Sequence, residues 1–231
     1  MESKTIAKIA QIASCLEVSG FPKPGNVHRT RDYDDMVFED FLISGVVIGD
    51  TIREAAENVD ENDLASAELG KYILEAVKET DNWIANNTNL GIVMLFVPIS
   101  VAASISEKFS DVRENIVNLM ENTTVDDAIN LYSAINIADA GGMGEQDEYD
   151  VASENANQEL RNNNQTMYDV LKISAPWDRL ANELTTTLPV CFELGYTEYS
   201  KLKKETTLNM ASVLTFLKIL SEVPDTLISR K

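Results

Sequence analysis

Residues 22–29, PKPGNVHR, combine several residue types that suit phosphate binding. Lys23 and Arg29 are cations, and Gly25 between them lets the backbone approach an anion closely or adopt a positive φ. His28 is the only histidine in the chain, so neither a histidine-based metal site nor a Ser-His-Asp triad can be assembled. It could act as a general base, donate to phosphate or serve the fold. The segment is predicted to be a phosphate-binding loop or, alternatively, a rigid turn between two helices.

Three carboxylates, Asp32, Asp34 and Asp35, follow within four residues. Acidic side chains suit the N-terminus of a helix, which would explain one or two of them. Three so close together repel one another unless they share a cation or a proton. Metal coordination is therefore the functional interpretation.

Asn87 and Asn89 belong to a second polar segment, NTNLG, directly before the most apolar stretch of the chain. Their carboxamides could cap the helix that begins there. They could also bind the ribose or base of a nucleotide, and the free N–H groups of the same helix could bind phosphate. The two interpretations are compatible.

The third polar segment, residues 139–151, reads DAGGMGEQDEYDV. Its Gly141-Gly142 pair is a weak phosphate-binding signal, and its acids lack the spacing of an EF-hand loop. A solvated acidic loop is one interpretation. The functional one is a lid that orders over a nucleotide.

Outside these three segments, apolar residues recur at helical spacing and alternating strand patterns are almost absent. The sequence therefore predicts one all-α domain over residues 1–231, with about eight to ten helices. Residues 90–105 are apolar all round and should form a buried central helix, which Pro98 should kink or divide. The predicted apolar stripes are Ile6, Ile9, Ala13 and Leu16; Phe38, Phe41, Leu42, Gly45, Ile48 and Ile52; Leu69, Ile73, Ala76 and Val77; and Met210, Val213, Leu214, Leu217 and Leu220.

Two further helices have recognisable start signals. Thr124 and Asp127 have the spacing of a capping box. Pro176 suits the first turn of a helix that runs toward Gly195.

The formal charge of −19 argues against non-specific binding to nucleic acid or anionic membranes. The N-terminus has no continuous apolar region of the signal-peptide type, and residues 90–105 are too short for a membrane span. Cys15 and Cys191 lack metal-ligand spacing and are expected to be buried free thiols in a reducing compartment. These features predict a soluble cytoplasmic protein.

With these motifs in place, the chain resembles the triphosphoribosyl-dephospho-CoA synthase family, whose members make the prosthetic-group precursor of citrate lyase and malonate decarboxylase. The order and rough spacing of the motifs hold over nearly the whole chain. The matching motifs are Leu16-Glu17-Val18, Pro22-Lys23-Pro24-Gly25, Asp35-Met36, Phe38 with Phe41-Leu42-x-Ser44, Asn87-Thr88-Asn89-Leu90-Gly91, Ala138-Asp139-Ala140-Gly141-Gly142 with Asp150-Val151, Trp177-Asp178-Arg179-Leu180-Ala181 and Asp225-Thr226-Leu227-Ile228-x-Arg230-Lys231.

The resemblance implies that the triphosphoribosyl unit of ATP moves to a 2′-hydroxyl of dephospho-CoA and adenine is released. Such glycosidic-bond cleavage passes through an oxocarbenium-like transition state, which needs a carboxylate nearby. The implied catalytic residues are Asp35, His28 and Asp139, and Mg²⁺ is implied at Asp35, Asp139 and Asp150. The implied nucleotide and phosphate ligands are Lys23, Gly25, Arg29, Asn87, Asn89, Gly141 and Gly142.

Departures from the family pattern keep other hypotheses open. Tyr33 stands where a histidine is usual, and Asn89-Leu90 replaces the usual His-Lys. The pattern resembles a divergent branch, so one alternative is transfer to a different ribosyl acceptor in another cofactor pathway, such as that of a pterin-type cofactor. Another is a non-enzymatic nucleotide-binding protein. A homo-oligomer is compatible with all three functional hypotheses. Family members usually continue beyond Lys231 through one more helix, which predicts a shortened C-terminus.

Overall fold

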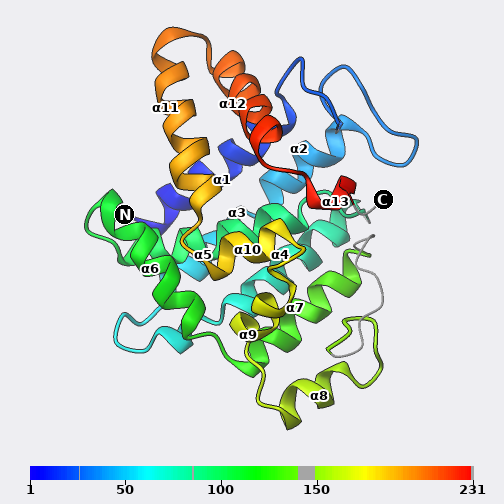
Figure 1. Ribbon diagram of the computed structural model, residues 1–231, viewed down its shortest axis with the longest axis vertical. Coiled ribbons are helices and arrows are strands. Elements are labelled where there is room, and N and C mark those ends of the chain that lie inside the picture. The colour runs from blue at the N-terminus through cyan, green and yellow to red at the C-terminus, as the bar shows by residue number, and fades with distance from the viewer. Residues whose placement is uncertain (26, 85, 140–148, 230–231) are drawn as a thin grey trace.

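Helices form nearly everywhere that the apolar spacing predicts them (Figure 1). The structure is a computed structural model that describes residues 1–25, 27–84, 86–139 and 149–229. Within these ranges there is no β-strand, and ten α-helices have eight or more residues, so the all-α prediction is confirmed. The α-helices are α1 (Ser3–Val18), α2 (Phe38–Val47), α3 (Gly49–Glu57), α4 (Leu69–Ile84), α5 (Leu90–Ile105), α6 (Phe109–Glu121), α7 (Val125–Ile137), α8 (Ala156–Asn162), α9 (Met167–Ser174), α10 (Arg179–Thr185), α11 (Tyr196–Glu205), α12 (Leu208–Glu222) and α13 (Thr226–Ser229), with a 3₁₀-helix η1 (Leu64–Ala67) and a π-helix η2 (Val190–Gly195).

Helix α5 lies at the centre of the core, as its composition predicts. Val93, Val97 and Val101 are fully buried, and α5 packs against α1, α3, α4 and α6. The helix runs unbroken through Pro98, whose ring is buried, so the prediction that Pro98 divides it is wrong. A proline removes one helical N–H, but the packing on all sides outweighs that loss.

Helices α4 and α7 meet closely at their first turns. Asp127 is buried and closes the predicted capping box, because its backbone N–H donates to Thr124 Oγ1 at 3.1 Å and Thr124 N donates back to Oδ2 at 2.8 Å. Its other oxygen, Oδ1, accepts the backbone N–H of Gly70 at 2.8 Å. The capping box is confirmed, and the same carboxylate also joins two helices.

A buried polar network connects α2, α4 and the turn before α5. Thr88 Oγ1 donates to Ser44 Oγ at 2.8 Å, and Asn89 Nδ2 donates to Thr80 Oγ1 at 3.0 Å. All four residues are at most 9% exposed. Buried polar groups that find partners in this way fix the relative positions of the elements that carry them.

Helices α11 and α12 form a hairpin at the top of Figure 1, in front of α1 in that view. No residue of α11 is buried, and its main packing partners are α12 and η2. Of the predicted α12 stripe, Val213 is buried and the other four members are 36–40% exposed. The predicted helix is confirmed, and its apolar stripe lies mostly at the surface.

Two other predictions need correction. In α1 the buried face carries Ile6 and Ala10, whereas Ile9 and Leu16 are exposed, so the predicted stripe mixes two faces. The single helix predicted from Pro176 to Gly195 is two helices, α10 and η2. Pro189 disfavours helical geometry at the preceding residue, and Leu188 adopts a φ of 48° there.

Among the described helices, none combines the length and apolar character that a membrane crossing requires.

Candidate functional site

Residues 20–37, which contain PKPG, form a loop with its own hydrogen bonds between α1 and α2. His28 and Arg31 exchange backbone hydrogen bonds of 3.0 and 2.8 Å. Tyr33 Oη donates to the Gly25 carbonyl at 2.8 Å, and Gly25 has a φ of 91°, which glycine adopts without strain. Tyr33, which replaces the family's usual histidine, therefore holds the PKPG turn in shape.

Arg29 and Lys23 face different surroundings. Arg29 is exposed, and its Nε donates to the Ser19 carbonyl at 2.7 Å. The Lys23 side chain is only 4% exposed and its Nζ pairs with the Glu17 carboxylate and carbonyl, beneath the ring of Phe216. The predicted contact of Lys23 with phosphate is untested, but its ammonium group is directed inward here.

The aspartates in the second half of this loop have different environments. Asp32 Oδ1 accepts the backbone N–H of Phe38 at 2.8 Å and so caps the start of α2. The Asp35 side chain is exposed. The Asp35 carbonyl accepts Nδ2 of Asn86 at 2.9 Å, which joins the first and second predicted segments.

The second segment carries one exposed and one buried asparagine. Asn87 is exposed, and its Oδ1 accepts the Leu90 N–H at 3.3 Å, so it caps α5 as predicted. Asn89 is 5% exposed, and its amide donates into the network described above rather than toward solvent. His28 is likewise 9% exposed, with Nδ1 at 3.2 Å from Thr30 Oγ1 and its ring 5.7 Å from that of Phe21.

The third segment is described only at its ends, and Gly141 and Gly142 lie outside the described residues. Asp139 is exposed, with a φ of 46°, just after α7. Asp150 accepts the Ala152 N–H at 2.9 Å, and Asn136 Nδ2 donates to the Val151 carbonyl at 3.1 Å. Both ends of the segment therefore lie at the last turns of α7.

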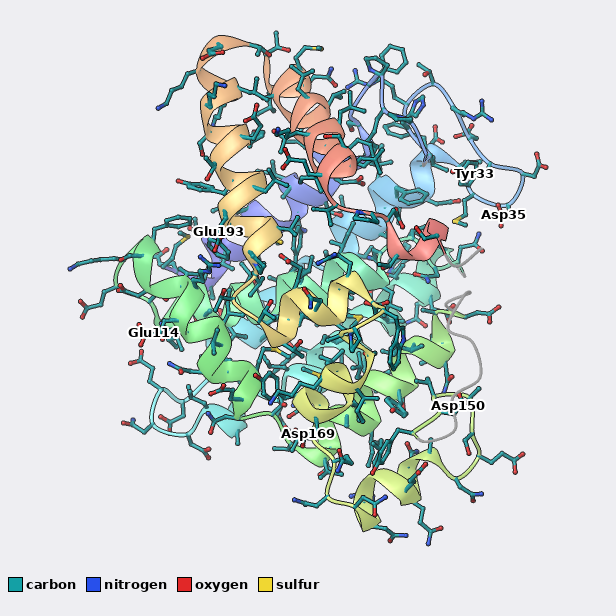
Figure 2. All side chains as sticks on the ribbon, viewed as in Figure 1. Tyr33, Asp35, Glu114, Asp150, Asp169 and Glu193 are labelled. Atoms are coloured by element: carbon teal, nitrogen blue, oxygen red, sulfur yellow. The ribbon has the colours of Figure 1, made fainter. Side chains whose placement is uncertain are left out.

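Figure 2 shows Asp35 and Asp150 well apart in projection, and a projected separation is a lower limit to the real one. The structure thus joins the first and second segments, whereas Asp150, near the end of the third, lies away from Asp35. Among the residues that the structure describes, no group of three or more histidine, cysteine or acidic side chains could hold a metal ion. The three predicted ligands therefore form no preformed metal cage.

Arg179 emerges from the structure as an additional cation near the second segment. Its backbone N–H donates to Thr226 Oγ1 at 3.1 Å, and its neighbour Leu180 lies next to Gly91 at the start of α5. Nη1 donates to Asn182 at 3.2 Å, whereas the buried Nε has no partner within the described part of the chain. In the sequence, Asp178-Arg179 stands out only as part of one of the matching motifs, and nothing in that pattern reveals an unpartnered nitrogen.

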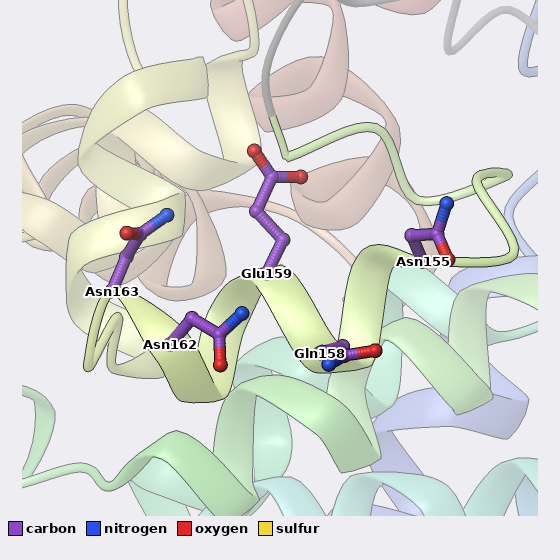
Figure 3. Close-up of a pocket in the computed structure, with 5 residues that line it drawn as sticks. All are labelled: Asn155, Gln158, Glu159, Asn162 and Asn163. Carbon is purple, nitrogen blue, oxygen red and sulfur yellow. The ribbon is translucent and has the colours of Figure 1, made fainter.

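Hollows on the described surface include one along α8 and one between the end of α1 and the start of α12. One, of about 300 Å³, follows α8 and contains none of the predicted residues; Figure 3 shows its five side chains, four of them carboxamides. The other, of about 240 Å³, is lined by Arg29 together with Leu16, Ser19, Thr207, Leu208, Asn209 and Ser212. Only the second involves a predicted site residue.

Cys15 and Cys191 are free thiols, as expected, but both are only partly buried. Burial, assisted by the nearby Glu183 carboxylate, raises the pKa of the Cys191 thiol to about 12. Glu183 is 4% exposed and accepts the backbone N–H groups of Val190 and Cys191 at 3.1 and 2.9 Å. This carboxylate therefore caps η2, a structural role that the sequence pattern did not reveal.

Comparison with known proteins adds one match. The profile of the ATP:dephospho-CoA triphosphoribosyl transferase family (CitG) matches residues 3–231, nearly the whole chain. No curated protein and no solved structure matches the chain. The match agrees with the motif resemblance and gives no support to the non-enzymatic or different-acceptor alternatives. The chain belongs to the ATP:dephospho-CoA triphosphoribosyl transferase family, and it is a transferase.

Proposed function

We propose that triphosphoribosyl transfer takes place where residues 20–37 meet the Asn86–Asn89 turn, with Asp35 beside the reacting ribose. The observation that carries this proposal is the 2.9 Å hydrogen bond from Asn86 Nδ2 to the Asp35 carbonyl. It joins two motifs that lie 51 positions apart in the sequence and leaves the Asp35 carboxylate exposed.

In this proposal the exposed and buried polar residues have different tasks. Arg29 binds phosphate oxygens of ATP, supported by Gly25, and Arg179 is a second cation for the triphosphate. Asn87, which is exposed, contacts the ribose or base. Lys23, His28 and Asn89 hold the loops in position, because their polar groups are already engaged inside the fold. Gly141 and Gly142, which lie outside the described residues, are proposed as further phosphate ligands.

The reaction breaks the bond between ribose C1′ and adenine N9. The 2′-oxygen of dephospho-CoA forms the new bond to C1′ and loses its proton, while the departing adenine takes up a proton. The Asp35 carboxylate is placed to stabilise the positive charge that develops on the ribose or to accept the hydroxyl proton. Asp139, exposed at the end of α7, is the second candidate for these tasks.

Mg²⁺ is proposed to arrive with ATP. It commonly binds through one or two carboxylates together with substrate phosphates and needs no complete protein cage. The exposed Asp35 fits this mode, whereas a joint site with Asp150 does not fit the separation seen in Figure 2. When bound, the ion would offset the charge of the triphosphate. Chelation should abolish activity, and added Mg²⁺ should restore it.

The proposed site is tested by incubating the protein with ATP and dephospho-CoA and measuring the released adenine by chromatography. Asp35→Asn should lower the rate by roughly 100-fold or more, because it removes the charge but keeps the side-chain shape. Asp34→Asn, at an adjacent exposed carboxylate, should change it less than about threefold. Equal rates for the two variants would contradict the role of Asp35. Adenine release by the wild type only with a different acceptor would contradict dephospho-CoA as substrate.

A further inference from the structure

Asn209 connects the α11–α12 hairpin to the PKPG loop. It lies in the first turn of α12, and its carboxamide makes two hydrogen bonds to one residue of the loop, Phe21. The Phe21 N–H donates to Oδ1 at 3.0 Å, and Nδ2 donates to the Phe21 carbonyl at 2.5 Å. Both backbone groups of Phe21 are thus paired with a side chain 188 positions away.

The same carboxamide also contacts Arg29. Nη2 of Arg29 donates to Asn209 Oδ1 at 3.2 Å and to the Ser19 carbonyl, and Nε donates to Ser19 as well. These bonds orient the guanidinium group from two sides. Its Nη1 has no hydrogen-bond partner in the described ranges and is left for an anion.

Other α12 contacts support this docking but do not orient Arg29. Val213 lies beside Gly20, at 3.6 Å from the position that a Cβ on that glycine would occupy, and Phe216 lies over Lys23. Arg29 and Asn209 line the same hollow of about 240 Å³. Asn209 is therefore the α12 side chain through which the hairpin contacts the predicted phosphate-binding residue.

We propose that Asn209 is a positioning residue for ATP: it fixes the Arg29 guanidinium so that Nη1 meets a phosphate of the triphosphate. The inference rests on the proposed phosphate contact of Arg29. Binding groups act best when neighbouring hydrogen bonds hold them in the productive orientation, and small misplacements cost large factors in rate or affinity.

A double-mutant cycle tests this role. Arg29→Ala, Asn209→Ala and the double variant are compared with the wild type for the KM of ATP, the KM of dephospho-CoA and kcat. Asn209→Ala should raise the KM of ATP roughly 10-fold and leave that of dephospho-CoA within about twofold. It should have no further effect when Arg29 is already alanine, because residues that act through one another are not additive.

Two more variants separate positioning from folding. Asn209→Asp keeps an oxygen acceptor for Arg29 and for the Phe21 N–H but adds a negative charge that competes with phosphate for the guanidinium, so its KM for ATP should rise at least as much as that of the alanine variant. Asn162→Ala, an exposed asparagine on α8, should leave all constants unchanged. Thermal unfolding of each variant identifies any that fail to fold.

The outcomes separate the positioning role of Asn209 from the phosphate contact of Arg29. An equal rise in the KM of ATP from Asn209→Ala with and without Arg29 would overturn the positioning role while keeping Arg29 as a phosphate ligand. An unchanged KM of ATP in Arg29→Ala would remove the proposed role of Arg29, and the inference about Asn209 with it.

Discussion

The backbone N–H of Gly70 lies 2.8 Å from Oδ1 of Asp127, and a side chain at Gly70 would collide with the backbone of the same aspartate. A Cβ built there would lie 2.2 Å from the Asp127 carbonyl oxygen and 2.5 Å from its Cα. Glycine at position 70 is therefore required by the close approach of α4 and α7.

Gly70→Ala should lower the free energy of unfolding by on the order of 3 kcal/mol, since backbone cannot move aside as a flexible side chain can. Chemical denaturation measures this change. Gly91→Ala is the matched control, because the added Cβ would meet only Leu180, at an ordinary 3.8 Å. That variant should be as stable as the wild type or slightly more stable. Similar losses in both variants would contradict the steric argument.

Glu183 gives a second prediction about stability. Glu183→Ala leaves the Val190 and Cys191 N–H groups without their acceptor, at a cost of about 1–3 kcal/mol for each buried group. Glu183→Gln keeps one acceptor oxygen and should lie between the wild type and the alanine variant. The exposed Glu193→Gln, which loses only its ion pair with Arg113, should change stability by less than about 1 kcal/mol. A different order in urea denaturation would argue against the capping role.

The thiols supply a prediction about pH. With a pKa of about 12, only about 10⁻⁴ of Cys191 is thiolate at pH 8, so a disulfide reagent should modify it very slowly in the folded protein. The rate should keep rising tenfold per pH unit past pH 9, where an ordinary thiol levels off. Unfolding in urea should make both cysteines react at once. Comparing Cys15→Ser with Cys191→Ser assigns the two labelling rates. Fast labelling of Cys191 at pH 8 would contradict the raised pKa of its thiol.

Asn89 allows structural and ligand-binding roles to be separated. Asn89→Ala and Thr80→Ala each remove one side of the same 3.0 Å hydrogen bond, so both should lower the thermal midpoint by similar amounts. The KM of ATP should change equally little in the two variants if the amide serves only the fold. A larger rise in Asn89→Ala alone would instead support the direct nucleotide contact predicted from sequence.

The sequence predicted the helices better than it predicted how their faces pack. Apolar spacing and the Thr124–Asp127 pair identified helices correctly, because these signals depend on nearby residues. Periodicity alone does not say which neighbour covers an apolar stripe, so it could not show that Ile9 and most of the α12 stripe are exposed. The break at Leu188 was missed because the helical pattern continues on both sides of it.

Candidate site residues were chosen by type, whereas their orientation depends on distant partners. Nothing near Lys23 or Asn89 in the sequence shows that Glu17 and Thr80 engage their polar groups. The link between Asp35 and Asn86 could be expected only from the family motifs. Asn209 carries no motif at all, and its importance follows from a contact across 188 positions.

That contact also has a consequence for biosynthesis. Because Phe21 is held by a residue of α12, the PKPG loop lacks its final hydrogen bonds until nearly the whole chain has left the ribosome. Contacts between distant parts of a chain form late and slow the final folding steps. Nascent chains that end before Asn209 should therefore assemble the core helices while Phe21 still lacks these hydrogen bonds and Arg29 lacks its Asn209 contact.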